Sequence, residues 1–100
     1  MSAGSVRRPA TTRHLDFLND MVGGSSPLPP IAVLVGFRFT EFEVGHAVAE
    51  MESEPRHANP MGTLHGGILC DLGDAAMGFA MASTLGEGES FTTIDLRINF

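Results

Sequence analysis

The stretch NPMGTLHGGILCDLGDAAMG, from Asn59 to Gly78, places groups that can do acid–base and hydrogen-bond chemistry inside an apolar run. A histidine and two glycines come first, and two aspartates follow among leucines, alanines and methionines. Two glycines at a helix start leave the first backbone N–H groups uncovered, and these groups carry about half a positive charge. One such donor can stabilise a developing oxyanion by roughly 3–4 kcal/mol. The stretch predicts a site that polarises a carbonyl, with a simple tight turn as the alternative.

Asp74 stands out because the predicted helix is apolar on all sides. At about 100° per residue, one broad face carries the larger apolar residues, and Asp74 lies opposite that face. A helix that is apolar all round is expected to be buried, and a desolvated carboxylate suits a general base or a nucleophile. The alternative is a structural carboxylate that accepts hydrogen bonds from a buried donor. The broad face comprises Ile68, Leu72, Ala75, Ala76, Phe79 and Ser83, and the neighbours of Asp74 are Cys70, Met77, Gly78 and Met81.

The spacing of these groups has a consequence for the number of chains in a site. Gly66 and Asp74 are eight residues apart, which is about 12 Å along a helix. One reacting carbonyl cannot touch both within a single chain, so we expect a two-fold dimer with composite sites. Asp71 is expected in or near the first helical turn, where a carboxylate complements the helix dipole, and is interpreted as structural.

The elements that must position these residues follow from the hydrophobic pattern. A polar tail of residues 1–10 precedes a helix that Thr11 or Thr12 caps and Gly23–Gly24 ends. The Pro- and Ser-rich stretch after it is expected to be a loop. The runs IAVLVGFRFTEFEVG, from Ile31, and HAVAEMES predict two strands, and SFTTIDLRINF predicts a third after the helix from Gly66 to about Ser83. The resulting class is α+β, with an antiparallel sheet wrapped on the long helix.

Composition narrows the function classes. The 100 residues carry a formal charge of −6, and the six basic residues are scattered arginines, which argues against nucleic acid as a partner. The single cysteine, Cys70, favours a reducing compartment, and the first residues lack the apolar core of a secretory signal. Asp71 and Asp74 within the apolar run argue against a membrane span. We therefore expect a cytoplasmic protein without cofactor; the spacing of its histidines and Cys70 predicts no metal site.

Taken together, NPMGTLHGG, an aspartate nine positions after the histidine, and TTIDLRINF resemble the hotdog-fold acyl-CoA thioesterases. The phenylacetic-acid-degradation (PaaI-like) branch is the most similar, and the resemblance covers about residues 31–100. It implies a long central helix wrapped by an antiparallel sheet, and homodimers or dimers of dimers with active sites at the dimer interface. Family members continue through further strands, so residues 11–100 are expected to form a hotdog domain that is incomplete at its C-terminus.

The resemblance also implies roles for individual residues. Asp74 matches the catalytic carboxylate, which acts from the opposite subunit as general base or as nucleophile. Gly66 matches the helix-start glycine whose N–H polarises the thioester carbonyl, and His65 matches the histidine that positions the thioester or its leaving sulfur. Asn59 matches an asparagine that orients the attacking water. Thr93 matches a hydroxyl residue beside that water, with Thr92 as the alternative alignment.

The predicted function is hydrolysis of an acyl-CoA thioester to the free acid and CoA. Met77 and Met81 are expected to line the acyl pocket, and Gly67 is expected to contact substrate at the helix start. Arg56 is interpreted either as a contact to a coenzyme phosphate or as a solvated loop residue. Two alternatives stay open, a non-catalytic acyl-CoA-binding protein of the same fold and a structural subunit. Whether the acyl group is aryl or fatty is also left open.

Overall fold

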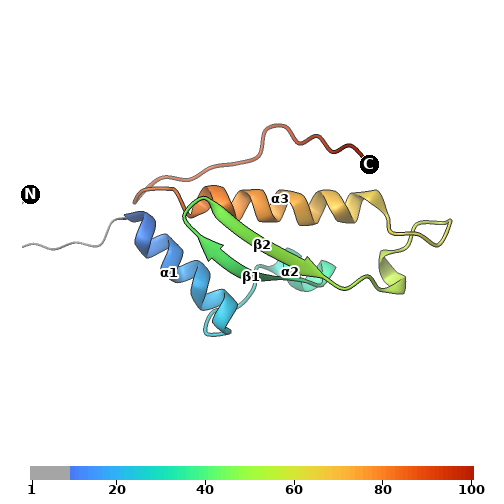
Figure 1. Ribbon diagram of the computed structural model, residues 1–100, viewed down its shortest axis with the longest axis horizontal. Coiled ribbons are helices and arrows are strands. Elements are labelled where there is room, and N and C mark those ends of the chain that lie inside the picture. The colour runs from blue at the N-terminus through green and yellow to red at the C-terminus, as the bar shows by residue number, and fades with distance from the viewer. Residues whose placement is uncertain (1–9) are drawn as a thin grey trace, which may run out of the picture.

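The computed structural model describes residues 10–100 of the chain, with side chains described from Leu15 onward. The predicted tail therefore lies outside the described residues, apart from Ala10. Two helices precede a two-stranded antiparallel sheet, and a long helix follows it (Figure 1). In chain order the elements are α1 (Ala10–Gly23), α2 (Pro30–Val35), β1 (Phe37–Glu43), β2 (His46–Met51), a short 3-10 helix (Pro55–His57) and α3 (Gly66–Ala82).

Helix α1 confirms the first helix predicted from the sequence, although it begins at Ala10, slightly before the expected threonine cap. Leu18 and Met21, which are three residues apart on the expected apolar face, are buried against the sheet side of the molecule. The chain leaves the helix through Gly24, whose φ of 83° is a conformation that favours glycine.

The strand predicted from Ile31 onward is wrong in its first part, because residues 30–35 form the short helix α2. Pro30 occupies the start of that helix, where its missing N–H costs nothing. Gly36 ends it in the left-handed region with φ 94°, and its N–H donates to the carbonyl of Ala32 at 2.7 Å. The proline at the start and the glycine at the end favour a short helix, and this outweighs the strand propensity of the valines. Strand β1 therefore begins only at Phe37.

The two strands predicted before the long helix are both present, and β1 pairs antiparallel with β2 to form a hairpin. Phe37, Phe39 and Phe42 are all buried, although the last two are three residues apart. An irregularity in the register between Phe39 and Glu41 makes this possible. A bulged strand places one extra residue opposite its partner and so shifts the alternation of faces by one. The hairpin therefore presents three phenylalanine rings to a single core.

Helix α3 confirms the predicted long helix and its broad face. Ile68, Leu72, Ala75 and Phe79 pack against the core, and the ring centroid of Phe79 lies 4.6 Å from that of Phe39. The expectation that this helix is buried on all sides is wrong for the chain by itself, since none of its residues is fully buried. The reason is that the small hairpin covers only one side of the helix.

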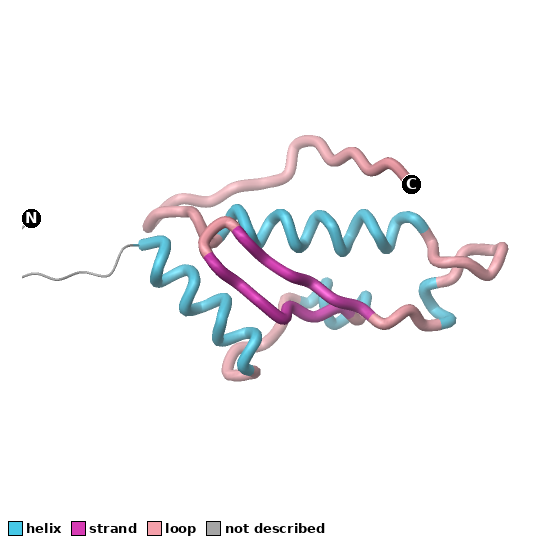
Figure 2. Tube along the Cα trace, in the orientation of Figure 1, coloured by secondary structure: helices cyan, strands magenta, loops and turns pink. Residues whose placement is uncertain are grey.

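The strand predicted at residues 90–100 is not formed. The segment is extended and runs back along α3 toward that helix's N-terminus, rather than joining the hairpin (Figure 2). Its side chains lie over glycines of α3. A Cβ built on Gly78 would lie 3.4 Å from the ring of Phe91, and one built on Gly66 would lie 3.0 Å from that of Phe100. Alternating apolar residues make a strand only where a neighbouring strand completes the hydrogen-bond ladder.

The α+β class predicted from the sequence is confirmed, and a long helix packed on an antiparallel sheet is compatible with a hotdog arrangement. A polar contact secures the far end of α3 to the hairpin. Ser83 is fully buried; its Oγ accepts the Gly45 N–H at 2.7 Å and donates to the carbonyl of Ala80 at 2.6 Å. None of the helices in residues 10–100 combines the length and apolar composition that a membrane crossing requires.

Candidate functional site

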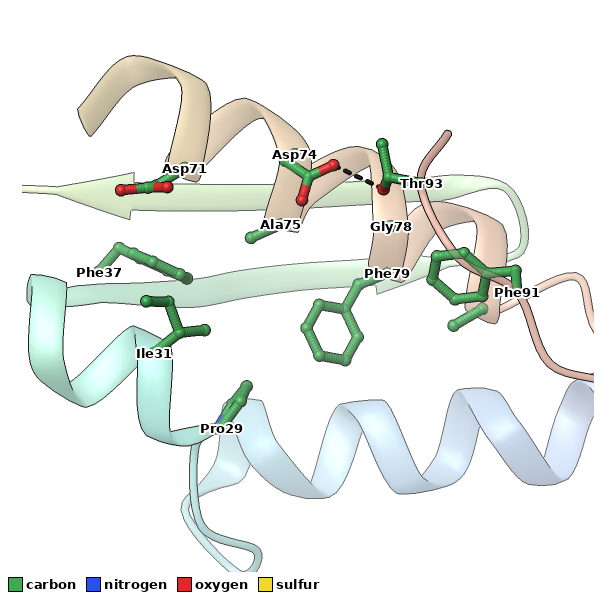
Figure 3. A pocket seen from close by; sticks show the side chains of 11 residues that line it. Pro29, Ile31, Phe37, Asp71, Asp74, Ala75, Gly78, Phe79, Phe91 and Thr93 are labelled. Atoms are coloured by element: carbon green, nitrogen blue, oxygen red, sulfur yellow. Dashed lines mark hydrogen bonds between the residues drawn. The ribbon is translucent and has the colours of Figure 1, made fainter. Parts of the chain in front are cut away.

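An apolar cavity with two carboxylates at its margin lies beside the middle of α3. Its volume is about 360 Å³, within the range of small-molecule sites. Figure 3 shows Asp71, Asp74 and Thr93 on one side and rings from β1, α3 and the C-terminal segment on the others. The lining residues are Pro29, Ile31, Phe37, Asp71, Asp74, Ala75, Gly78, Phe79, Ala82, Phe91 and Thr93.

Asp74 and Thr93 form the polar pair of this cavity. Thr93 Oγ1 donates a hydrogen bond to Asp74 Oδ1 at 2.8 Å, as the dashed line in Figure 3 marks. Asp74 is half-buried. Thr93 rather than its neighbour Thr92 is therefore the threonine that meets the carboxylate. The bond restrains one oxygen of the carboxylate and leaves the other available to a ligand or a water molecule.

A second, smaller hollow of about 170 Å³ adjoins the same carboxylate. Met77 and Met81 line it together with Asp74, Phe91 and Thr93. Both methionines are exposed in the chain, at 56% and 50%. The methionines expected beside an acyl group thus lie on the same side of α3 as the predicted catalytic carboxylate.

The start of α3 carries the other predicted site residues. His65 precedes the helix in an extended conformation, and its carbonyl accepts the N–H of Ile68 at 3.0 Å. The His65 ring lies over Gly67, where an added Cβ would come within 2.8 Å of its Nε2. A larger residue at position 67 would displace the imidazole, so the ring can lie here only because the second residue of the motif is glycine.

Asn59 organises the turn that leads into this helix start. Its side-chain Oδ1 accepts the N–H groups of Met61 and Thr63, both at 3.0 Å, and its Nδ2 donates to Thr63 Oγ1 at 2.8 Å. A turn held by an asparagine side chain in this way is a common use of the residue. In the single chain, the amide of Asn59 therefore serves the 59–63 turn.

The structure sorts the predicted site residues into two separate groups. One group surrounds the middle of α3, and the other lies at the start of the helix, eight residues away from Asp74 at Gly66. Because α3 is one continuous helix, that separation is about 12 Å along its axis. The middle group is Asp74, Met77, Met81 and Thr93, and the group at the helix start is Asn59, His65, Gly66 and Gly67.

Arg56 belongs to neither group. Its Nε donates to Glu54 Oε2 at 2.7 Å and its Nη1 donates to the carbonyl of Leu34 at 2.9 Å. The guanidinium therefore links the 3-10 turn to the end of α2, and it lines neither of the two hollows. Its side chain also lies where a Cβ on Gly36 would be, so the two residues fit together only because position 36 is glycine.

Asp71 is the site residue that the sequence interpretation missed. It is the sixth residue of α3, beyond the first turn, so the helix-dipole role assigned to it is wrong. It lies three residues before Asp74 and therefore on the same side of the helix, and both line the larger cavity. This i, i+3 spacing was the signal available in the sequence. The contributions of Ile31, Phe37 and Phe91 come from distant segments and carried no local signal.

His57 has a structural place rather than a role as a ligand. It is 3% exposed, its Nδ1 accepts the Glu54 N–H at 3.0 Å, and its Nε2 lies 2.6 Å from the carbonyl of Val35. Since Nδ1 accepts, Nε2 must carry the proton and donate, which identifies the neutral tautomer. Within the described part of the chain, no three His, Cys, Asp or Glu side chains are grouped closely enough to hold a metal ion.

Comparison with known proteins places the chain in a family. Residues 26–100 match the family described as "Domain of unknown function (DUF4442)". A Pseudomonas aeruginosa protein named "Putative esterase PA0474" is 36% identical over 53 residues, which are 53% of this chain and 40% of that protein. The matched stretch thus spans less than half the length of that relative, and no solved structure matches the chain. Since the family match extends over three quarters of its residues, the chain belongs to the DUF4442 family.

Proposed function

We propose that this chain hydrolyses acyl-CoA thioesters, at sites that two copies of it form together. The observation that carries the proposal is the Thr93–Asp74 hydrogen bond of 2.8 Å at the margin of an apolar cavity. An oriented carboxylate beside space for an acyl group is what water activation at an ester carbonyl requires. The esterase name of the Pseudomonas aeruginosa relative supports the hydrolase part of the proposal. The thioester and CoA part rests on the resemblance of the motif.

The chemistry follows from the hydrogen-bond capacity of this pair. Thr93 donates a hydrogen bond to one oxygen of Asp74. The second carboxylate oxygen can therefore accept a proton from a water molecule. The water oxygen then forms a bond to the acyl carbon, and the carbon–sulfur bond breaks. The proton taken up by Asp74 passes to the leaving thiolate, and the products are the free acid and CoA. In the alternative route, Asp74 attacks the acyl carbon itself and water hydrolyses the resulting anhydride.

The second copy is needed because of the separation along α3. The Gly66 N–H at the helix start is the donor proposed for the developing oxyanion, and it is about 12 Å from Asp74 along the same helix. A two-fold partner can bring its own helix start to the carboxylate. In that arrangement His65 and Asn59 of the same helix start would arrive beside the leaving sulfur and the water.

The first test is turnover of a panel of acyl-CoAs, followed with a thiol reagent. Asp74→Ala should lower kcat about 10²–10⁴-fold, as expected for loss of a general base. Glu52→Ala is the matched control, because it removes an exposed carboxylate that lines neither hollow, and its kcat should be unchanged. Turnover retained in Asp74→Ala would refute the assignment. Binding of acyl-CoA without thiol release by the unaltered chain would favour a non-catalytic binding protein instead.

The second test addresses the composite site. Gly66→Pro removes the proposed oxyanion donor, and proline is tolerated at the first helical position, although the Phe100 ring must shift. Each variant alone should be inactive. Random mixing of Gly66→Pro with Asp74→Ala should restore about a quarter of the activity, because half of the dimers would then hold one intact site of two. No recovery in mixed dimers whose formation is demonstrated would contradict the shared site.

A further inference from the structure

The larger cavity combines apolar walls with negative charge and carries no positive charge. Its walls are aliphatic and aromatic side chains, including Ile31, Phe79 and Phe91, and its polar lining is Asp71, Asp74 and Thr93. No arginine or histidine is among the lining residues described. Asp71 is exposed and Asp74 is half-buried, so the two carboxylates sit at the margin while the aromatic rings form the interior.

From this arrangement we propose that the cavity accepts uncharged apolar acyl groups of medium size, and that Asp71 is the specificity-determining residue that rejects groups ending in a carboxylate. The identification of the ligand as an acyl group rests on the proposed function. The preference for an uncharged group over a carboxylate rests on the cavity alone. It concerns a residue that the proposed reaction itself does not use.

The size of the acceptable group follows from the volume. A non-hydrogen atom with its hydrogens fills about as much space as a water molecule, roughly 30 Å³. The cavity of about 360 Å³ therefore holds on the order of ten such atoms, allowing for its opening to solvent. An acyl chain of about eight carbons fills this space, and a longer chain would extend through its opening into solvent.

The charge preference follows from the two aspartates. A neutral thioester carbonyl can approach them without repulsion, whereas the carboxylate of the free acid would enter a region with two like charges and no partner cation. The hydrolysis product would therefore leave more readily than the substrate. Acyl groups with a second carboxylate would be disfavoured for the same reason. Since Asp71 is exposed, its charge acts through solvent, so its effect should be modest and sensitive to salt.

The experiment measures binding and needs no turnover. Octanoate, 1-octanol and octylamine share one chain and differ in the charge of the head group. Each is titrated into the full chain in about 0.01 M salt, and the backbone amide signals of Gly78, Phe79 and Phe91 report whether the cavity is the site. The same titrations are repeated with Asp71→Asn and with Glu52→Gln. The second variant removes one exposed carboxylate outside the cavity.

The expected order of affinity in the unaltered chain is octylamine, then 1-octanol, then octanoate. Asp71→Asn should reduce the ratio of the octanoate Kd to the octanol Kd by about three- to five-fold, as expected for one charge pair near the surface. Glu52→Gln should leave it unchanged. In about 1 M salt, where the Debye length is ~3 Å, the gap should nearly close.

Equal affinity for octanol and octanoate in the unaltered chain would overturn the proposal. An affinity difference that Asp71→Asn leaves unchanged would overturn it as well, and so would signal changes elsewhere than the cavity for all three probes. The proposed hydrolase can fail independently. Absence of thiol release would leave these binding preferences intact, and a correct order of affinity would not rescue an inactive enzyme.

Discussion

The sharpest consequence for stability concerns Ser83, which ties the β1–β2 turn to the end of α3. Ser83 is 0% exposed, and its Oγ accepts the Gly45 N–H at 2.7 Å. Gly45 has a φ of 76°, a left-handed conformation that the turn needs and that glycine adopts at little cost. Ser83→Ala leaves a part-buried donor without an acceptor, which costs about 1–3 kcal/mol. Against a domain stability of about 5–15 kcal/mol, this is a large share.

The loss is measured by urea unfolding followed with far-ultraviolet circular dichroism, since the chain has neither Trp nor Tyr for intrinsic fluorescence. A loss of about 2 kcal/mol lowers Tm by roughly 10 °C in a domain of this size. Hydrogen exchange at the Gly45 amide supplies the specific readout, because only this N–H loses its acceptor. The matched control is Thr84→Ala, which removes an exposed hydroxyl that donates to the Met81 carbonyl at 2.7 Å, and should cost less than about 0.5 kcal/mol. Equal losses in the two variants, or an unchanged Gly45 exchange rate, would refute the reasoning.

Two further predictions concern His57 and Thr93. His57→Ala leaves the Glu54 N–H and the Val35 carbonyl without their partner, and should lower the free energy of unfolding by about 1–3 kcal/mol in the same urea assay; an unchanged midpoint would contradict this. Thr93→Val keeps the shape but removes the hydrogen bond to Asp74, and under the proposed function kcat should fall about ten-fold, while Thr93→Ser retains most activity. Equal kcat for these two variants in the thiol-release assay would show that the hydroxyl takes no part.

The fold was predictable where the local pattern and the tertiary partner agree. The helical face of Ile68, Leu72 and Phe79 was visible in the spacing, because the same residues must cover the hairpin. The region from Ile31 was misinterpreted because β-branched residues outweighed the proline and glycine that frame a single helical turn. The segment 90–100 has perfect strand alternation, but strand formation depends on a neighbouring strand that its own residues do not encode.

Most residues of the candidate site could be predicted from the sequence, but the contacts between them could not. The separation of Gly66 from Asp74 follows from helix geometry alone, and both residues do lie on one continuous helix in the structure. The contact between Thr93 and Asp74 required knowledge of how the C-terminal segment returns along α3, nineteen residues later in the chain. Asp71 was overlooked although the helix start at Gly66 was predicted correctly, because it was counted with the first turn and its i, i+3 spacing to Asp74 was not used.

The path of residues 91–100 has a consequence for ligand entry. These residues supply Phe91 and Thr93 to the cavity, yet they belong to no helix or strand and touch α3 mainly through side chains. Segments with few backbone hydrogen bonds open locally far more often than the whole domain unfolds. The side of the cavity formed by this segment can thus open and close while the helix and the hairpin stay folded. The association rates of small apolar molecules should accordingly depend on how often this segment opens locally, rather than on the global stability of the protein.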